Sequence, residues 1–189
     1  MFILIGLGNP GKEYEGTRHN AGREAAVYFA KKEKLGEFEE DKNLQALVLL
    51  SKLKKEKILM ILPETFMNNS GKTVKALFDK KILKKTKNKE IKNFALLHDD
   101  LDIPLGKFKI SFGKNSAGHK GVESVIRALK TKKFIRIRIG ISPERKPDSK
   151  KILNFIIGRF SAKEKEILNG VFKKIHLAIQ AIVSERVSR

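Results

Sequence analysis

Short runs of apolar and β-branched residues alternate with longer segments in which apolar residues recur every three or four positions. The short runs predict β-strands, and the longer periodic segments predict amphipathic helices. The strands are expected near residues 2–7, 44–51, 56–62, 94–98, 107–112 and 133–141. The helices are expected near residues 20–34, 71–80, 119–130, 150–157 and 162–186. This order predicts an α/β fold, with a single globular domain over residues 1–189 and a twisted mixed β-sheet flanked by helices.

The last predicted helix has a marked start and a clear apolar face. Ser161 and Glu164 have the spacing of a capping box. The apolar stripe that follows comprises Ile167, Val171, Phe172, Ile175, Ala178, Ile179 and Ile182. We expect this helix to pack on the sheet and to carry no chemistry, and we interpret His176 as a surface or packing residue.

Two predicted strands, residues 107–112 and 134–141, each have an apolar side and a cationic side. Side chains alternate between the two faces of a strand, so the cations of each strand share one face. If the two strands are neighbours, these cations form a patch of the size of a phosphate, whereas the alternative is a pair of ordinary solvated faces. The cationic positions are Lys107, Lys109, Arg136 and Arg138.

The composition excludes several classes of protein. A hydrophobic fraction of 41% is ordinary for a globular domain, and no apolar run approaches the ~20 residues of a membrane span. Met1 leads directly into a predicted strand and leaves no room for a signal peptide, so we expect a cytoplasmic protein. The chain has no cysteine, which rules out disulfides, thiolate metal sites and cysteine nucleophiles.

The charge points to a polyanionic partner. The 41 lysines and arginines against 21 aspartates and glutamates give a formal net charge of +20. Such an excess attracts nucleic acid. The alternative is that the many lysines reflect an A+T-rich genome and lie on solvated faces. Residues 84–92 are especially rich in lysine, and we interpret them as a loop within one domain.

A glycine-rich loop follows the first strand and brings polar side chains to the strand's end. Its sequence is GLGNPGKEY (6–14), and TRHNAG (17–22) comes next. Glycine permits close backbone approach, and open α/β sheets bind ligands where their strands end. A tight turn with a capping asparagine explains the glycines but not the imidazole of His19. The chain has no GxxxxGK[ST] phosphate loop, and Pro10 interrupts the helix start that a dinucleotide site requires.

The strand near residues 94–98 runs into the carboxylates Asp99, Asp100 and Asp102. Carboxylates at a strand end can bind a metal or orient a catalytic base. Alternation places Asp100 and Asp102 on one side and Asp99 on the other, and no second acidic cluster completes a metal cage. We therefore favour an aspartate that holds His19 in the correct tautomer, with a solvated turn as the alternative.

Two other loops carry polar groups. The segment PETFMNNSG (63–71) contains two asparagines, whose amides suit a carbonyl, an oxyanion or a water molecule. The alternative is that Asn69 or Ser70 caps the next helix and Phe66 belongs to the core. The glycine-rich loop over residues 113–118 runs into a helix whose free N–H groups favour anions.

These segments together resemble bacterial peptidyl-tRNA hydrolase, over most of the chain and in the order of that family. The resemblance implies a single α/β domain that cleaves the ester between a peptide and the 3′ ribose of tRNA, without metal or organic cofactor. The lack of an obvious spare apolar stripe favours a monomer. The matching segments are GLGNPGKEY (6–14), TRHNAG (17–22), PETFMNNSG (63–71), HDDLDIPLGKFK (98–109), GHKG (118–121) and FIRIRIGI (134–141).

The resemblance assigns roles to individual residues. It implies that His19 is the catalytic base and Asp99 its partner. It implies that Asn9 and Asn68 are amides around the peptide and the catalytic water. A non-catalytic RNA-binding relative of the same fold is the second hypothesis, and the presence of all four residues favours the enzyme. A general esterase is the third, but the chain has no Gly-x-Ser-x-Gly elbow.

The rim of the site and the RNA contacts follow from the same resemblance. Tyr14 and Phe66 match positions near the tRNA terminus and the peptide, and His119 matches a histidine at the mouth of the cleft. Lys120 stands where the family usually has asparagine, and an ammonium group cannot accept a hydrogen bond. Lys109 and Arg138 match the pair that clamps the 5′ phosphate of tRNA, and Lys107 and Arg136 lie beside them.

Overall fold

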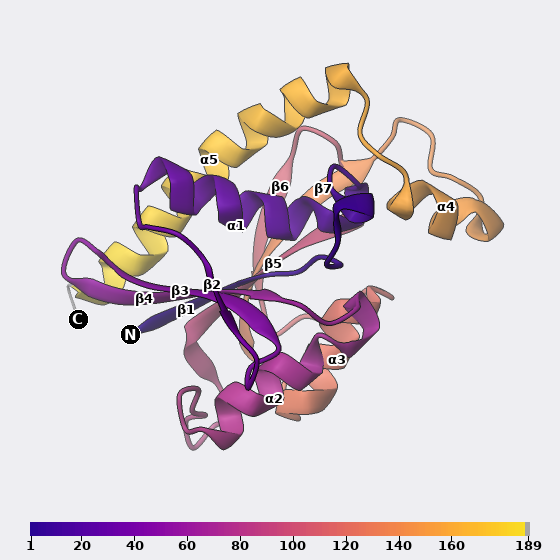
Figure 1. Cartoon of the computed structure of the whole chain (residues 1–189). Helices are drawn as coiled ribbons and strands as arrows, with labels where there is room; N and C mark the ends of the chain where they lie inside the picture. The colour runs from indigo at the N-terminus through magenta and orange to yellow at the C-terminus, as the bar shows by residue number, and fades with distance from the viewer. Residues whose placement is uncertain (188–189) are drawn as a thin grey trace.

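A seven-stranded mixed β-sheet lies at the centre of the fold, with helices on both sides of it (Figure 1). The computed structural model describes residues 1–187. The strands, in chain order, are β1 (Phe2–Gly6), β2 (Glu39–Asp41), β3 (Ala46–Leu53), β4 (Glu56–Pro63), β5 (Ile91–Pro104), β6 (Phe108–Phe112) and β7 (Phe134–Ser142). The helices are α1 (Ala21–Lys32), α2 (Gly71–Asp79), α3 (Lys120–Leu129), α4 (Ile152–Ile157) and α5 (Ala162–Val187). Short 3-10 turns lie at η1 (Lys12–Tyr14), η2 (Arg18–Asn20), η3 (Met67–Asn69) and η4 (Ser149–Lys151).

The centre of the sheet is parallel, in the order β2-β3-β4-β1-β5-β7-β6. β1 pairs in parallel with β4 and β5, and β5 pairs in parallel with β7. β2, β3 and β6 are attached by antiparallel pairing. The four parallel strands therefore end at one edge of the sheet, which is where ligands bind in open α/β folds. The predicted site loops after β1, β4 and β5 all start from this edge.

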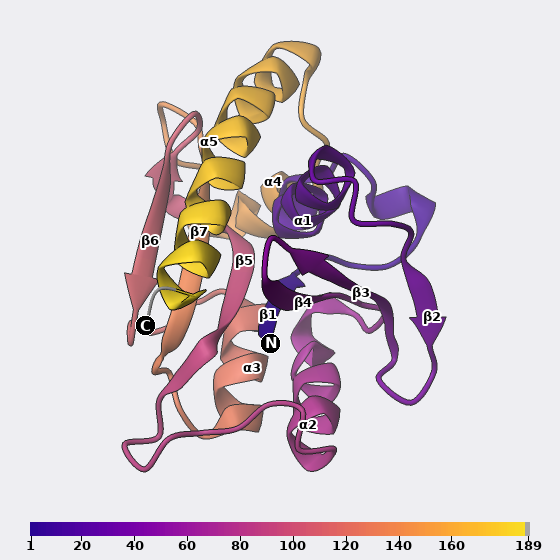
Figure 2. The same ribbon diagram turned by 90° about the vertical axis from the view of Figure 1, so that its left-hand side faces the viewer.

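Helices cover both faces of the sheet and enclose two cores (Figure 2). β1 is apolar throughout because its alternate side chains enter different cores. Phe2 and Leu4 pack on the face covered by α1 and α5. Ile3 and Ile5 pack on the face covered by α2 and α3. The predicted α/β class is confirmed, while the assignment of residues 1–189 to a single domain stays a prediction.

The predicted helices and most strands lie within a few residues of their observed bounds, with two differences. β5 extends from Ile91 to Pro104, so the predicted carboxylates Asp99, Asp100 and Asp102 lie in the strand rather than after it. β2, at Glu39–Asp41, was not expected because its acidic residues lack the apolar alternation of a strand. It forms by backbone pairing to β3, which side-chain polarity does not reveal.

The edge strand β6 also differs from the sequence prediction. Phe108 packs against the core, but Ile110 and Phe112 are 50% and 45% exposed. β6 pairs on one side only, with β7, so its outer side chains lack a neighbouring strand to cover them. The apolar side of a strand is therefore only partly buried at this edge of the sheet.

α5 begins with the predicted capping box and buries most of the predicted stripe. Glu164 N donates to Ser161 Oγ at 3.3 Å, and Ser161 N donates to Glu164 Oε2 at 2.7 Å. The stripe prediction is wrong at Ile167, which is 41% exposed, and it omitted Leu168 and Val183, which are buried. Among the described residues, no helix combines the length and the apolar character that a membrane span requires.

Candidate active site

His19 and Asp99 meet at the edge of the sheet where the parallel strands end. His19 lies in η2, directly before α1, and Asp99 lies in β5. Nδ1 of His19 is 3.0 Å from both carboxylate oxygens of Asp99, and both side chains are buried. Gly22 permits this approach, because a side chain at that position would collide with the carbonyl oxygen of Leu97. The predicted juxtaposition of His19 and Asp99 is therefore present.

A second histidine contacts the same carboxylate. Nε2 of His119 is 2.8 Å from Oδ1 of Asp99. Its Nδ1 accepts hydrogen bonds from the backbone N–H groups of Gly121 and Val122, at 3.1 and 3.3 Å, and so caps α3. A nitrogen that accepts cannot carry a proton, so the geometry assigns His119 the neutral tautomer with its proton on Nε2, donating to Asp99.

The carboxylate is held ionised by these two rings. Burial alone raises the pKa of Asp99, but attraction to His19 and His119 and the hydrogen bonds from both rings outweigh burial and hold that pKa far below its usual range. For His19, burial lowers the pKa, whereas the charge and the hydrogen bond of Asp99 together raise it above its ordinary value. Asp99 therefore stabilises the protonated imidazole of His19 and fixes which nitrogen faces outward.

His98 supports this arrangement from beneath. Its Nδ1 is 2.6 Å from the backbone carbonyl oxygen of Asp99, and its ring stands edge-on to that of His119 at 4.9 Å. Burial and the neighbouring His119 lower the pKa of His98 well below its ordinary value, so it is neutral. No role was predicted for His98 from the sequence, and its contact with the Asp99 backbone makes it a packing residue under the site.

Asn9 is fixed by the loop that carries it. Its backbone N–H donates to Oδ1 of Asn20 at 2.8 Å, and Nδ2 of Asn20 donates back to the Asn9 carbonyl at 2.9 Å. Oδ1 of Asn9 accepts from the backbone N–H of Met67 at 2.7 Å, which leaves its NH₂ group as the remaining donor. Asn20 was expected at the end of the strand together with Asn9 and His19 but was given no role of its own, and the structure shows that it holds the backbone of Asn9.

Asn68 does not share a hollow with His19. The hollow around His19, about 310 Å³, is lined by Asp99, His119, Lys120 and α4 side chains among others. Asn68 is exposed in η3 and lines a separate groove between α2 and α3. Phe66, 56% exposed, stacks edge-to-face on Tyr14 with ring centres 6.3 Å apart. The predicted substrate residues thus lie around one edge of the sheet, but not in one enclosed cavity.

Lys120 lies at the rim of the hollow with an exposed side chain. Its Nζ is 3.4 Å from Oε2 of Glu123 in the first turns of α3. An exposed pair of this kind contributes little to stability. The ammonium group is therefore available to another anion at the mouth of the site.

The cationic strands are neighbours, as the phosphate-patch prediction requires, but one of their four cations is buried. Lys109 stands directly opposite Arg138, and Nε of Arg138 donates to Oδ2 of Asp100 at 2.7 Å. Lys107 is exposed just before β6. Arg136 is 1% exposed, so its predicted place in an open patch is wrong. It stands opposite Ser111 beneath α3, and burial together with the charge of Arg138 lowers the pKa of its guanidinium.

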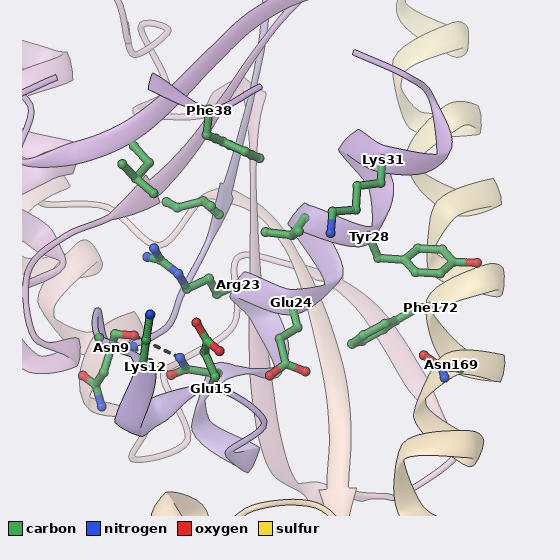
Figure 3. A pocket seen from close by; sticks show the side chains of 15 residues that line it. Asn9, Lys12, Glu15, Arg23, Glu24, Tyr28, Lys31, Phe38, Asn169 and Phe172 are labelled. Carbon is green, nitrogen blue, oxygen red and sulfur yellow. Dashed lines mark hydrogen bonds between the residues drawn. The ribbon is translucent and has the colours of Figure 1, made fainter. Parts of the chain in front are cut away.

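A larger cavity, about 690 Å³, lies beside α1 (Figure 3). Arg23 and Glu24 line it from α1, Asn9 and Lys12 from the first loop, and Phe38 from the loop before β2. Glu24 accepts the Gly16 N–H at 2.7 Å, and Arg23 donates to the Pro63 carbonyl at 3.0 Å. Arg23 and Glu24 thus form hydrogen bonds that hold neighbouring segments against α1. Neither His19 nor Asp99 lines this cavity.

His19, Asp99 and His119 also form a group that could hold a metal ion, since one ligand atom from each lies within 4.8 Å of the others. Three of these ligand atoms are already joined by hydrogen bonds, since Nδ1 of His19 and Nε2 of His119 both contact Oδ1 of Asp99. The nitrogen of His119 that faces away from Asp99 is used by α3. The absence of a metal from the reaction stays a prediction.

Family and sequence comparisons match this chain to peptidyl-tRNA hydrolases over nearly its full length. Residues 3–189 match the family model for peptidyl-tRNA hydrolase. A peptidyl-tRNA hydrolase of Coprothermobacter proteolyticus is 41% identical over 175 residues, which are 89% of this chain and 81% of that protein. One from Dehalococcoides mccartyi is 35% identical over 185 residues, covering 97% of this chain and 94% of that protein.

A solved structure agrees with these relatives. The crystal structure of peptidyl-tRNA hydrolase from Acinetobacter baumannii has 25% sequence identity and a TM-score of 0.87, and the match covers 100% of this chain and 91% of that one. Sequence and fold agree over nearly the full length, and on that ground the chain belongs to the peptidyl-tRNA hydrolase family.

Proposed function

We propose that this enzyme hydrolyses the ester bond between a peptide, or an N-blocked amino acid, and the 3′ ribose of tRNA, and so recycles peptidyl-tRNA released from stalled ribosomes. The observation that supports this most directly is the contact between Asp99 and Nδ1 of His19 at 3.0 Å. It orients the imidazole with Nε2 outward, and within residues 1–187 no hydrogen bond engages that nitrogen. A neutral imidazole so held is a general base.

The reaction begins with water. Nε2 of His19 removes a proton from a water molecule as its oxygen attacks the ester carbonyl, and a tetrahedral oxyanion forms. Asp99 stabilises the imidazolium that results. When the intermediate collapses, the bond to the 3′ oxygen breaks and the imidazolium returns its proton to that oxygen. The products are a free peptide and a tRNA with an intact 3′ hydroxyl.

Two amides serve the carbonyl side of the reaction in this proposal. The NH₂ group of Asn9 is the donor left after its other atoms bind Asn20 and Met67. It donates to the peptide or to the oxyanion, a contribution worth ~3 kcal/mol in other acyl-transfer enzymes. Asn68, exposed on η3, binds the substrate backbone. Tyr14 and Phe66 then offer aromatic surface beside the reacting end.

The tRNA is recognised through phosphate. Lys109 and Arg138 clamp the 5′ phosphate, with Lys107 beside them, and the buried Arg136 adds positive potential from beneath. Asp100 binds Nε of Arg138 and leaves the other guanidinium nitrogens for the ligand. At the mouth of the hollow, Lys120 binds an anionic group of the substrate, and His119 holds Asp99.

We further propose that the enzyme acts as a monomer in the cytoplasm, where peptidyl-tRNA is formed, and uses no metal or organic cofactor. All 189 residues then form one domain. Size-exclusion chromatography with light scattering checks the monomer, and activity after treatment with a chelator checks the metal. A dimer at working concentration or a loss of activity with the chelator contradicts these points separately.

The central test is release of an N-acetylated amino acid from its tRNA ester by the purified protein. His19→Ala should lower kcat about 100- to 10,000-fold, because the base is lost, while uncharged tRNA still binds. His176→Ala is the matched control, since this imidazole lies on α5 against Glu33 and should leave kcat unchanged. Full activity of the His19 variant contradicts the proposal and favours a protein that only binds RNA.

A further inference from the structure

Two lysine-rich loops lie side by side at the edge of the sheet opposite to His19 and Asp99. Residues 80–92 comprise the connection from α2 to β5 and the first two residues of β5, and residues 130–133 join α3 to β7. The hydroxyl of Thr131 donates to the Lys89 carbonyl at 2.8 Å, and Ile91 N donates to the Lys133 carbonyl at 2.8 Å. Together these two loops, here named the lysine shelf, contain ten lysines and one glutamate. Such a density of charge selects a polyanion.

A groove between α2 and α3 connects the lysine shelf with the active-site edge. The two helices start together there, where Gly71 N donates to Ser124 Oγ at 3.0 Å. Both then run toward the loops of the shelf (Figure 2). The groove has a volume of about 380 Å³. Asn68 lies at the end of the groove where the two helices start, and Lys72, Lys75 and Arg127 line its walls.

The cations of the groove are available to a ligand. Within residues 1–187, the side chains of Lys72 and Arg127 have no ion-pair partner. Lys75 pairs with Asp79 at 2.5 Å, but both side chains are more than half exposed. An exposed pair contributes little, so an incoming phosphate replaces the aspartate at a small free-energy cost.

Distance decides which part of a tRNA can reach these residues. α3 has 10 residues, so at ~1.5 Å per residue the lysine shelf begins about 15 Å below His119. The reacting ester at His19 therefore cannot touch the shelf. A nucleic-acid strand, in contrast, carries a phosphate at every nucleotide and offers a row of anions at this distance. The groove lies on the side of α3 that faces α2, whereas Lys109 and Arg138 lie on β6 and β7, on the other side of α3 (Figure 2).

We propose that the groove between α2 and α3 and the lysine shelf bind the sugar–phosphate backbone of the base-paired stem of tRNA. This inference rests on the proposed function and adds a second RNA surface, separate from the 5′-phosphate clamp. The contacts are to phosphate and carry no base specificity. Their effect is to favour a whole tRNA over a short 3′ fragment that carries the same ester.

The test compares two triple variants of equal charge. Lys84→Gln, Lys87→Gln and Lys89→Gln remove three exposed lysines from the lysine shelf. The control, Lys52→Gln, Lys55→Gln and Lys57→Gln, removes three exposed lysines from the β3–β4 hairpin. Each is assayed with an N-acetylated aminoacyl ester of whole tRNA and with the same ester on a CCA trinucleotide.

The shelf variant should raise KM for the whole tRNA about tenfold and leave kcat unchanged, because phosphate contacts are made in ground and transition states alike. Its log(kcat/KM) should fall less steeply with log[salt], by roughly one for each lysine–phosphate interaction that the substitutions remove. The trinucleotide ester should be hydrolysed as by the wild type, and the control variant should match the wild type on both substrates. Lys72→Gln with Arg127→Gln should repeat the shelf result.

Equal effects of the two triple variants overturn the inference, since they show only the loss of net charge. An equal effect of the shelf variant on both substrates overturns it as well. If the wild type hydrolyses neither ester, the proposed function fails. Direct binding of uncharged tRNA to the two variants then still decides whether the lysine shelf contacts RNA.

Discussion

At the scale of single residues, hydrogen bonds give the three histidines around Asp99 different roles. His119 donates from Nε2 and accepts at Nδ1, so both nitrogens are occupied. His98 is buried and neutral and supports the strand through the Asp99 carbonyl. His19 is fastened by Nδ1 and keeps Nε2 for a substrate or water. His19 is therefore the histidine of the three that we propose as the catalytic base.

Asp99→Asn tests this assignment through pH. The carboxylate raises the pKa of His19, so its removal should lower that pKa and move the acid limb of the kcat/KM profile to lower pH. The plateau should fall at least about 100-fold, because the amide cannot stabilise the imidazolium equally well. The pH–rate profile of the variant is compared with that of Asp102→Asn, whose exposed carboxylate pairs with Lys146 at 2.5 Å. An unshifted limb with an undiminished plateau contradicts the pairing.

At the scale of elements, successive side chains of β5 point to opposite faces of the sheet, so the two aspartates near its carboxyl end contact different partners. Asp99 points to the side of α1 and reaches His19, whereas Asp100 points to the opposite side and reaches Arg138. Neighbouring residues on one strand thereby hold His19, the proposed base, and Arg138, a member of the proposed phosphate clamp, at a fixed separation. α3 starts at the same place, with His119 as its cap.

His119 has two structural tasks that substitution can separate. His119→Ala should lower the free energy of unfolding by about 1 kcal/mol through loss of the cap, and should also lower kcat. His119→Asn should restore most of the stability, because asparagine is a good N-cap, but its shorter side chain cannot reach Asp99. Urea unfolding and kcat are measured for both. Recovery of kcat along with stability in the asparagine variant shows that the cap is the only role.

At the scale of the whole molecule, the net charge of +20 includes two groups of cations that we propose to contact tRNA. The Lys109–Arg138 pair lies near the carboxyl ends of the parallel strands, and the lysine shelf lies at their amino ends. Both groups of cations attract a polyanion, and salt weakens that attraction. We propose that the two surfaces contact different parts of tRNA, the clamp a chain end and the shelf a stem.

Arg138→Gln should raise KM for a 5′-phosphorylated substrate about tenfold and leave kcat unchanged, since the phosphate is bound before and during the reaction. Removal of the 5′ phosphate from the substrate should raise the KM of the wild type similarly and should add nothing in the variant. Steady-state kinetics on the four combinations measure this coupling. A loss confined to kcat contradicts the clamp.

The order of helices and strands could be predicted from the chain because it depends on local periodicity. The apolar runs of β1 and the capping box of α5 need no distant partner to be recognised. The pattern of strand ends predicted that an aspartate of this segment holds His19, and the family resemblance selected Asp99, 80 residues away in the chain. β2 escaped prediction because its backbone pairing has no side-chain pattern.

The sequence by itself determined the α/β class and the family, and it predicted the base His19 and its carboxylate Asp99, since each of these depends on residue type and order. Only the tertiary structure decided that Arg136 is buried while Lys109 and Arg138 stay accessible, because burial depends on α3 packing over the sheet. It also decided the tautomer of His119, which depends on a helix start and a carboxylate 20 residues away in the chain. Alternation places a side chain on a face, but only the neighbours across that face determine what it can bind.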